Sequence, residues 1–565
     1  MNLIHNYATK KILLMKEELG WILYKYEDYE LWFKGHLLKT AIQDFFRKLR
    51  LIARNKDISP KDYKELLINT KGHFSVVLYC NGFVFASVDR ICSIPIYYLD
   101  SGKQKIVGIN PYLLKKFASL DSKLLLKSSA IEIAMSGYTI GSNTLYHGLN
   151  QLTAGQCLLI KDDTIKKYYY YTYSPWEVVK HGKKQLKNQL TDCLIETFED
   201  LIKSVDGRQV VIPLSAGRDS RLVASALKYL GYKSVFCFAY GNQNNFESKT
   251  SQYVAEKLGY SWMHVPLTKK SQKSFFTSQE FGEYCDKTET YSSIPFVQDV
   301  SSVNWLKSNE IISEDAVFVN GNTGDYISGG HIPLPLKKKS LEIVDFEVMQ
   351  SKSWNDFLNK HFTLWKVLRF ENNDIYIKNK LISLLSDRNI SILKDKETLH
   401  GFFECLEYLG RQSKYIVNMQ RSYDFYGYSW RMPLWSNQML DYWKGVPRVY
   451  KIDQDLYKSV LSENNWGAVW HDIPVNSGEI NSTTLKSMRF ISKMLYFPFG
   501  KDAWHSFERN VFQYFLDNSQ NSSIVPYYKV LFDRRGQRQW VSWMAELYLK
   551  NKGLETITKQ FPRNM

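Results

Sequence analysis

The chain has 565 residues, 44% hydrophobic and 23% charged, which is a soluble, folded composition on a chain too long for one compact core. Its formal charge of +17 could serve a nucleic acid, a membrane surface or an acidic substrate, but the lysines are scattered, so we interpret them as a solvated surface. Seven cysteines without a CxxC pair argue against a disulfide framework or zinc knuckle, and no apolar run is long enough for a membrane span, so we expect a cytoplasmic protein.

The first 178 residues are expected to form an α+β domain with layered sheets. Two apolar runs within residues 73–89 flank Asn81-Gly82, a pair typical of a β-hairpin turn. The other elements expected here are strands at residues 94–100, 156–163 and 165–173 and helices near Leu37–Ala53 and Ser128–Met135.

From about residue 180 the pattern changes to alternating strands and helices. Solidly apolar strands in such an alternation predict a parallel sheet covered on both faces. The expected helices are 184–205, 220–231 and 247–259, and the expected strands are 209–214, 233–241, 261–267 and 316–321. Residues 340–565 are expected to be largely helical. We therefore expect a second domain over residues 179–565, built on a doubly wound parallel sheet with a helical C-terminal part.

The stretch VVIPLSAGRDSRLVASALKYLG, residues 210–231, places a polar turn between a strand and a helix. Gly217 allows a ligand to approach the backbone, and Ser215 and Ser220 add hydroxyl groups. The free N–H groups at the start of the following helix suit an anion such as phosphate. Asp219 would repel phosphate unless both share Mg²⁺; alternatively, it only caps the helix.

Two further strand ends carry polar residues. The loop after Phe238, with Tyr240, could meet an adenosine or be a plain surface loop. The stretch VFVNGNTGDYISGGH ends an apolar strand at Asn320-Gly321 and then presents Asp325 among glycines. Because ligands bind beyond the carboxyl ends of parallel strands, Asp219 and Asp325 could share a metal that orients a triphosphate. Together the three strand ends favour a nucleotide site.

These motifs resemble a known family. PLSAGRDSRL is similar to the PP-loop, SGGxDS, of the ATP pyrophosphatases, specifically of the glutamine-hydrolysing asparagine synthetases. Residues 71–99 and 136–160 resemble that family's N-terminal glutaminase domain and the stretch that closes it. GNTGDYISGGH is similar to the family's GEGxDExxGGY, and YSWRMPLW is a remote echo of its EaRxPFxD. The resemblance thus extends nearly from end to end.

The resemblance implies a fold, a reaction and a site. The fold is an Ntn-hydrolase-like domain, residues 1–178, followed by an adenine nucleotide alpha-hydrolase-like synthetase domain, residues 179–565. The reaction is AMP-forming: ATP activates a carboxylate as an acyl-adenylate, pyrophosphate leaves, and ammonia forms the amide. The implied cofactors are ATP and Mg²⁺, with Mg²⁺ held by Asp219 and Asp325. The implied nucleotide-binding residues are Leu214, Ser215, Ala216, Gly217, Asp219, Ser220, Phe238, Tyr240 and Gly321.

The sequence departs from the family pattern at several positions. Asn2 stands where the glutaminase needs a nucleophilic cysteine, so we expect the first domain to be an inactive scaffold. Ala216 replaces the second glycine of SGG, and Asn322 replaces the glutamate of GEG. No lysine follows the motif at VWHDIPVN, so Arg218, Lys486 or Lys458 is the candidate for the catalytic cation; alternatively, each is a solvated surface cation.

The resemblance leaves several functions open. We favour an amide-forming ligase acting on a small-molecule carboxylate, such as a sugar acid of surface polysaccharide biosynthesis, with ammonia, a separate ammonia source or a substrate amine. The alternatives are a peptide or lactam cyclase with an intramolecular amine, true asparagine synthesis, and an inactive scaffold. PP-loop tRNA modification is disfavoured because no CxxC is present, so no nucleic-acid partner is expected. The sequence leaves a homodimer open.

Overall fold

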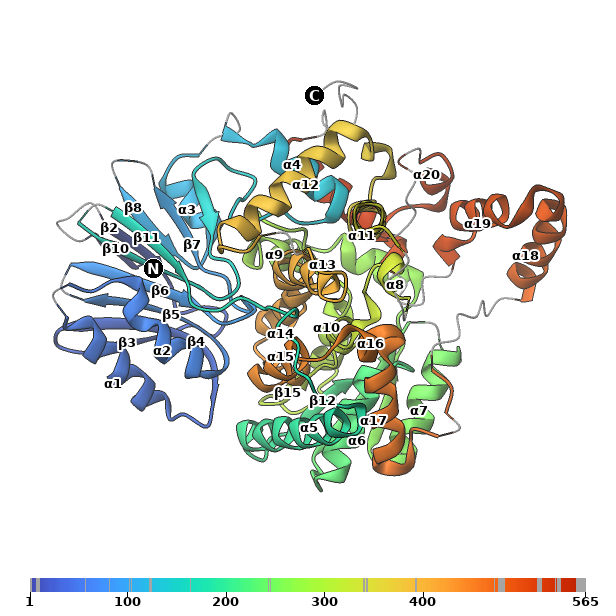
Figure 1. Cartoon of the computed structure of the whole chain (residues 1–565), viewed down its shortest axis with the longest axis horizontal. Coiled ribbons are helices and arrows are strands. Elements are labelled where there is room, and N and C mark those ends of the chain that lie inside the picture. The colour runs from blue at the N-terminus through green and yellow to red at the C-terminus, as the bar shows by residue number, and fades with distance from the viewer. Residues whose placement is uncertain are drawn as a thin grey trace.

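The computed structural model describes residues 3–6 and 11–554, apart from 56, 81, 101, 103, 121–123, 163, 242, 244, 339–340, 342–343, 392–393, 472, 476–482, 516–520, 534 and 536–539. A strand-rich N-terminal part lies beside a larger, mostly helical part, and one pair of helices stands out from the body (Figure 1). In the described part of the chain, no helix has the length and apolar character to cross a membrane.

The N-terminal part contains two sheets, both nearly all antiparallel. The first has the order β1 (Leu3–Asn6), β2 (Lys11–Met15), β8 (Lys105–Gly108), β7 (Tyr97–Asp100) and β9 (Leu149–Gln151), with only β2 and β8 parallel. The second has the order β11 (Thr164–Tyr169), β10 (Gln156–Lys161), β6 (Phe83–Val88), β5 (Lys71–Cys80), β4 (Tyr29–Leu38) and β3 (Ile22–Lys25). The expected hairpin is β5–β6, in which Cys80 pairs with Phe83.

Four helices accompany these sheets: α1 (Ile42–Ala53), α2 (Lys64–Asn69), α3 (Pro111–Phe117) and α4 (Lys127–Ser136). The expectation of a helix starting at Leu37 is wrong at its first turn, because Leu37 and Leu38 end the long strand β4. The apolar residues of this stretch continue from strand into helix, which hides the boundary in the sequence. The helix near Ser128–Met135 is α4, all but its first two residues buried.

The second part is organised by a five-stranded parallel sheet. Its order is β14 (Ser261–Val265), β13 (Val235–Tyr240), β12 (Val210–Pro213), β15 (Val317–Val319) and β16 (Ser429–Arg431). The chain runs outward from β12 to β13 and β14, then returns to the other side of β12 for β15 and β16. The strand order therefore reverses between β12 and β15, where open parallel sheets bind ligands. The predicted parallel sheet is confirmed, whereas β16, three residues long, was not predicted.

Helices supply the rest of this part. Those predicted around the sheet are α5 (Lys183–Val205), α6 (Arg218–Tyr229) and α7 (Phe246–Leu258). The others are α8 (Lys269–Phe276), α9 (Gln279–Lys287), α10 (Val300–Ser308), α11 (Phe346–His361), α12 (Glu371–Ser386), α13 (Leu399–Glu407), α14 (Gln420–Tyr426), α15 (Asn437–Lys444), α16 (Arg448–Lys451), α17 (Asp455–Asn464), α18 (Thr483–Tyr496), α19 (Gly500–Val511), α20 (Tyr527–Leu531) and α21 (Trp540–Asn551). The helical C-terminal region was predicted, and α21 returns to pack against α4.

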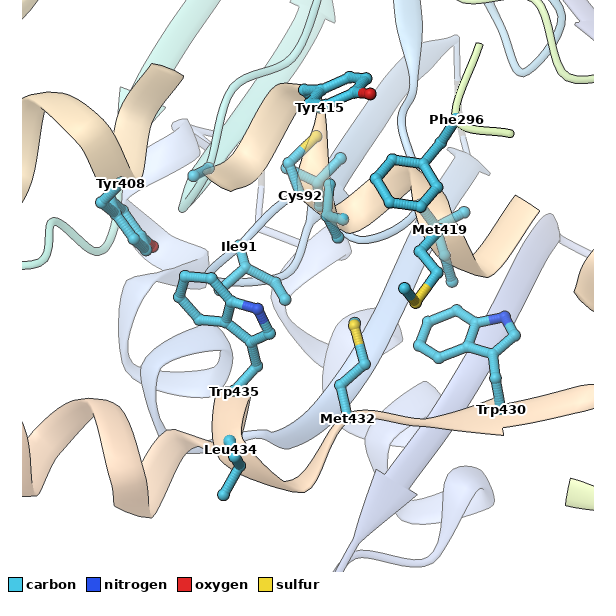
Figure 2. Packing of buried hydrophobic residues seen from close by; sticks show 14 of the residues in the cluster. Ile91, Cys92, Phe296, Tyr408, Tyr415, Met419, Trp430, Met432, Leu434 and Trp435 are labelled. Carbon is cyan, nitrogen blue, oxygen red and sulfur yellow. The ribbon is translucent and has the colours of Figure 1, made fainter. Parts of the chain in front are cut away.

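One hydrophobic core runs through both parts. Ile91 and Cys92, from the loop between β6 and β7, pack among buried aromatic and methionine side chains of the second part, including Tyr408, Met419 and Trp435 (Figure 2). A buried ion pair adds to this interface: Lys34 Nζ of β4 lies 2.5 Å from Asp424 Oδ2 of α14. The strand-rich part is therefore firmly attached to the sheet-bearing part.

Candidate functional site

The carboxyl ends of β12, β13 and β15 open into a cavity of about 670 Å³. The cavity brings together ten of the thirteen residues predicted from the sequence: Leu214, Ser215, Gly217, Arg218, Asp219, Ser220, Phe238, Tyr240, Gly321 and Asp325. Ala216, Lys458 and Lys486 do not line it. The cavity lies where the strand order of the parallel sheet reverses, as expected for an open parallel sheet.

The turn between β12 and α6 is closed by its own serines. The Ser215 N–H donates to Ser220 Oγ at 3.0 Å, and the Gly217 N–H donates to Ser215 Oγ at 3.1 Å. Helix α6 starts at Arg218, with Gly217 as its N-cap. The N–H groups of the first helical turn have no intrahelical acceptor and carry the positive end of the helix dipole. The turn and the helix end thus form a cradle suited to phosphate oxygens.

The loop after β15 contacts this cradle through two glycines. A Cβ at Gly324 would lie 2.3 Å from Asp219 Oδ1, and a Cβ at Gly321 would lie 2.4 Å from the carbonyl carbon of Asp219. Only glycine fits at either position. The approach lets the Asp325 N–H donate to Asp219 Oδ2 at 2.9 Å. The two aspartates predicted to act together therefore meet at the mouth of the cradle.

The surroundings of Asp219 and Asp325 shift the pKa values of the two carboxylates in opposite directions. Burial, together with the charge of Asp325, raises the pKa of Asp219 to about 7, although Tyr457 Oη donates to Asp219 Oδ1 at 3.0 Å. Burial alone would raise the pKa of Asp325, but the hydrogen bond from His331 Nε2, 3.2 Å from Asp325 Oδ2, lowers it. Two carboxylates this close repel each other when both are charged.

A divalent cation would remove this repulsion. Carboxylate oxygens are the ligands that Mg²⁺ prefers, usually one or two from the protein, with phosphate and water completing the set. Among the described residues no group of three or more His, Cys, Asp or Glu is arranged to hold a metal. Asp219 and Asp325, next to a phosphate cradle, therefore fit a magnesium ion that comes with a nucleotide.

His331 connects Asp325 to buried charges behind the cavity. Burial opposes its protonation, but the charge of Glu407 and hydrogen bonds to Asp325 and Glu407 raise the pKa of His331 to about 9. Its Nδ1 lies 2.6 Å from Glu407 Oε1, and Glu407 also lies 3.2 Å from His361 Nε2. His331 is thus a protonated bridge that orients Asp325. The sequence analysis missed it, although it closes the motif GNTGDYISGGH.

The wall of the cavity beside β12 and β13 combines apolar and aromatic side chains with a buried carboxylate. The Leu214 N–H donates to the Phe238 carbonyl at 2.8 Å, which holds the ends of β12 and β13 together. Tyr240 Oη donates to Asp299 Oδ1 at 2.6 Å, and Tyr423 Oη donates to Asp299 Oδ2 at 2.9 Å. Asp299 is a buried carboxylate in the cavity wall that the sequence analysis missed, because no motif surrounds it.

The predicted cations separate into two groups. Arg218 lines the cavity and makes no hydrogen bond or ion pair with other described residues. Lys458 is exposed on α17, outside the cavity lining, although the adjacent Tyr457 contacts Asp219. Lys486 is exposed on α18, away from the cavity. Lys360 at the end of α11 does line the cavity and was missed.

Arg221 attaches one segment of the cavity wall to α6. Its guanidinium donates to the carbonyls of Val469 and Ile473 through Nη1 and of Ala216 and Pro474 through Nη2, at 3.0–3.2 Å. These bonds hold the segment at residues 469–475 against α6, and they explain why Ala216 sits behind the turn. Val475 then reaches the cavity wall. Asn2 and Asp472 lie outside the described residues.

Comparisons with known proteins agree with this geometry. The family model for asparagine synthase matches residues 196–464, which include the cradle, both aspartates and β16. No curated protein matches the chain.

Two solved structures are similar to parts of the chain. One is described as the allosteric regulatory enzyme of purine biosynthesis, with 10% identity, a TM-score of 0.19, and coverage of 44% of this chain and 72% of its own. The other is glutamine phosphoribosylpyrophosphate amidotransferase from B. subtilis complexed with ADP and GMP, with 11% identity, a TM-score of 0.18, and coverage of 53% and 63%. The part of the chain that carries the parallel sheet and the cavity, residues 196–464, thus matches the asparagine synthase family.

Proposed function

We propose that this ATP-dependent, amide-forming ligase activates a small-molecule carboxylate as an acyl-adenylate, releases pyrophosphate, and then forms an amide with an amine. One observation supports the proposal above all others. Asp219 and Asp325 converge, through the Gly324 approach, on a serine-lined cradle at the start of α6. This arrangement suits a triphosphate whose leaving pyrophosphate must be held and neutralised.

Each part of the cavity has a proposed role. The first N–H groups of α6, with Ser215 and Ser220, bind the β- and γ-phosphates. Asp219 and Asp325 would hold Mg²⁺, which supplies charge neutralisation to the phosphates when bound. Leu214, Phe238 and Tyr240 would line the adenosine site, with an Ntn-hydrolase-like first domain packed behind. Asp325 is held in place by protonated His331.

The acceptor carboxylate is proposed to lie beside Arg218 and Lys360. Both line the cavity, and the Arg218 guanidinium makes no hydrogen bond or ion pair with another described residue, although its charge acts on Asp219. A guanidinium binds a carboxylate with two parallel hydrogen bonds and brings its oxygen to the α-phosphate. In the same position it stabilises the negative charge that develops on that phosphate. Arg218 thereby serves as the cation that the missing family lysine would supply.

Asn322 bears on which kind of acceptor molecule the cavity can bind. It lines the cavity where the family carries a glutamate, and its Nδ2 donates to Met419 Sδ at 2.9 Å. An amide cannot pair with an ammonium group as a carboxylate would. We therefore favour an acceptor without an amino group, such as a sugar acid of surface polysaccharides, over aspartate. The amine would be ammonia, free or from a separate source.

Carboxylate-dependent exchange of pyrophosphate into ATP tests the proposal. We expect exchange with at least one sugar acid and little with aspartate, and we expect Asp219→Asn to abolish it. Asp192→Asn, at an exposed aspartate of α5, is the matched control and should leave exchange intact. Undiminished exchange in Asp219→Asn would refute the assignment. A product that is one water lighter than a single substrate would instead identify an intramolecular cyclase.

A further inference from the structure

A pair of helices stands out from the body of the molecule (Figure 1). Helices α18 and α19 are joined by the short turn Phe497–Phe499, and we call residues 483–511 the outer hairpin. The two helices pack on each other: the rings of Tyr496 and Phe507 stack at 4.3 Å, and Arg489 Nε lies 2.5 Å from Glu508 Oε1. The hairpin attaches to the body near its end, where Tyr527 Oη donates to the Val511 carbonyl.

The outer hairpin exposes an unusual amount of apolar surface. Seven large side chains are between 58% and 85% exposed: Met488, Phe490, Ile491, Met494, Leu495, Phe497 and Phe499. They are consecutive or nearly so along one helix and its following turn, so they form one patch. Soluble monomers rarely expose a contiguous apolar patch of this kind, and such patches mark contact with a membrane or partner.

The patch faces away from α19. On α18 the side chains turned toward α19 are Arg489, Ser492 and Tyr496, which are spaced by three and four residues and half-buried. Residues with this spacing share one face of a helix. The apolar side chains of α18 itself therefore occupy the opposite, outward arc, and Phe497 and Phe499 follow in the turn. Phe499 touches the Tyr496 ring, with ring centroids 6.0 Å apart, and all seven side chains remain more than half exposed among the described residues.

The charge of α18 decides between possible occupants. Lys486, Arg489 and Lys493 are its charged residues, and it contains no acidic one. Lys486 and Lys493 are exposed and seven residues apart, so they lie on one side of the helix, bordering the apolar arc. An amphipathic helix with aromatic and aliphatic residues on one face and lysines at the border is typical of binding in the plane of a membrane surface. The lysine stems extend so that the ammonium groups reach lipid phosphates.

We propose that the outer hairpin docks the protein on the surface of a membrane that contains anionic lipids. The seven apolar side chains enter the boundary between headgroups and acyl chains, and the bordering lysines contact the phosphates. The helix lies in the surface and does not cross the bilayer. This inference is independent of the proposed ligase function, since no residue of the outer hairpin lines the nucleotide cavity.

Vesicle co-sedimentation of the full chain tests the proposal. We expect binding to phosphatidylcholine vesicles that contain phosphatidylglycerol, weaker binding to phosphatidylcholine alone, and weaker binding at high salt. The combined change Phe490→Ser, Met494→Ser and Phe497→Ser should reduce binding at least ten-fold, and Lys486→Glu with Lys493→Glu should remove the preference for anionic lipid. Val348→Ser with Ile375→Ser, at exposed apolar positions elsewhere, is the control and should not alter binding.

Thermal unfolding of each variant separates loss of binding from loss of the fold. Unchanged vesicle binding by the triple serine variant, with its unfolding temperature preserved, would overturn the proposal. The proposal would also be overturned if the wild-type protein bound neither kind of vesicle. If light scattering then showed a dimeric wild type and a monomeric triple variant, the patch would instead join two copies of the chain.

Discussion

At the scale of single residues, Gly324 is the position in the site where the absence of a side chain matters most. A Cβ at Gly324 would lie 2.3 Å from Asp219 Oδ1, which is too close for two non-bonded atoms. Any side chain at this position would therefore move one of the two aspartates. Neither aspartate is touched chemically by the change. A substitution at Gly324 therefore tests whether the position of the two carboxylates matters, while both carboxylates stay in the protein.

Gly324→Ala is expected to reduce carboxylate-dependent exchange about 100-fold, because a shift of about one ångström in a catalytic group has an effect of that order. The protein should remain folded, since Gly324 lies between Thr323 and Asp325, which line the cavity, and the strain falls on the nearby Asp219 carboxylate. Gly282→Ala, on α9 with open space around its Cβ position, is the control for an added methyl group. Normal exchange in Gly324→Ala would show that the aspartates need not be this close.

Arg218 and Lys458 provide a second test at this scale. Arg218→Ala should raise the KM for the acceptor acid about 10- to 100-fold, the loss of one or two charge-assisted hydrogen bonds. Lys458→Ala and Lys486→Ala should change exchange less than about two-fold, because neither lines the cavity. The measurement is exchange rate against acid concentration. A larger effect at Lys458 than at Arg218 would move the acceptor site toward α17.

At the scale of elements, the contact between α6 and the segment at residues 469–475 depends on one buried side chain. Arg221 is fully buried, and burial lowers its pKa to about 10, so it remains charged at neutral pH. It donates hydrogen bonds to four carbonyl oxygens, one in the turn before α6 and three in this segment. The segment forms part of the cavity wall, and its position therefore follows from α6.

Arg221→Met is expected to destabilise the protein by about 3 kcal/mol, because buried carbonyls lose charged hydrogen bonds while the volume is kept. Urea unfolding measures the change. Arg218→Met, three residues away on the same helix and without partners among the described residues, should change stability little. Equal stability of Arg221→Met and the wild type would mean that the segment at residues 469–475 is held by other contacts.

The elements also show how far a sequence can predict such a site. The strand-turn-helix at residues 210–231 and the glycine-rich loop before His331 were predictable, because short-range chemistry fixes both. Asp299 and Lys360 were not, since each stands in an ordinary stretch and reaches the cavity only through tertiary packing. Strand β16 escaped prediction because three residues show no alternation. The apolar arc of α18 resembles any buried helix until the structure shows that nothing covers it.

At the scale of the whole molecule, a buried lysine lies between the two parts of the chain. Lys414 Nζ donates to Thr139 Oγ1 at 2.9 Å and to the Asn143 carbonyl at 3.3 Å. Burial lowers the pKa of Lys414 to about 7, although the charges of Glu132 and Cys92 oppose the shift. In the unfolded chain a lysine has a pKa near 10.4. Between these values the unfolded chain binds more protons than the folded protein.

Stability is therefore expected to rise with pH from about 7 to about 10, by up to about 1.4 kcal/mol per pH unit from this group. Denaturant unfolding across this range, compared between the wild type and Lys414→Met, isolates the effect. The variant should lose the slope, whereas Lys529→Met, at an exposed lysine of α20, should keep it. Parallel slopes in the wild type and Lys414→Met would show that Lys414 stays charged in the fold.

The packing of α21 on α4 has a consequence for biosynthesis. Helix α4 belongs to the first part of the chain to leave the ribosome, and its buried residues include Ile133, Ala134 and Met135. Its partner α21 follows every other described helix in the sequence. During translation this surface of the nascent N-terminal part stays uncovered until α21 has also been made. Ribosome-bound or prematurely terminated chains would thus expose an apolar surface that is prone to aggregation. Chaperones and proteases that recognise unfolded chains would bind such a surface.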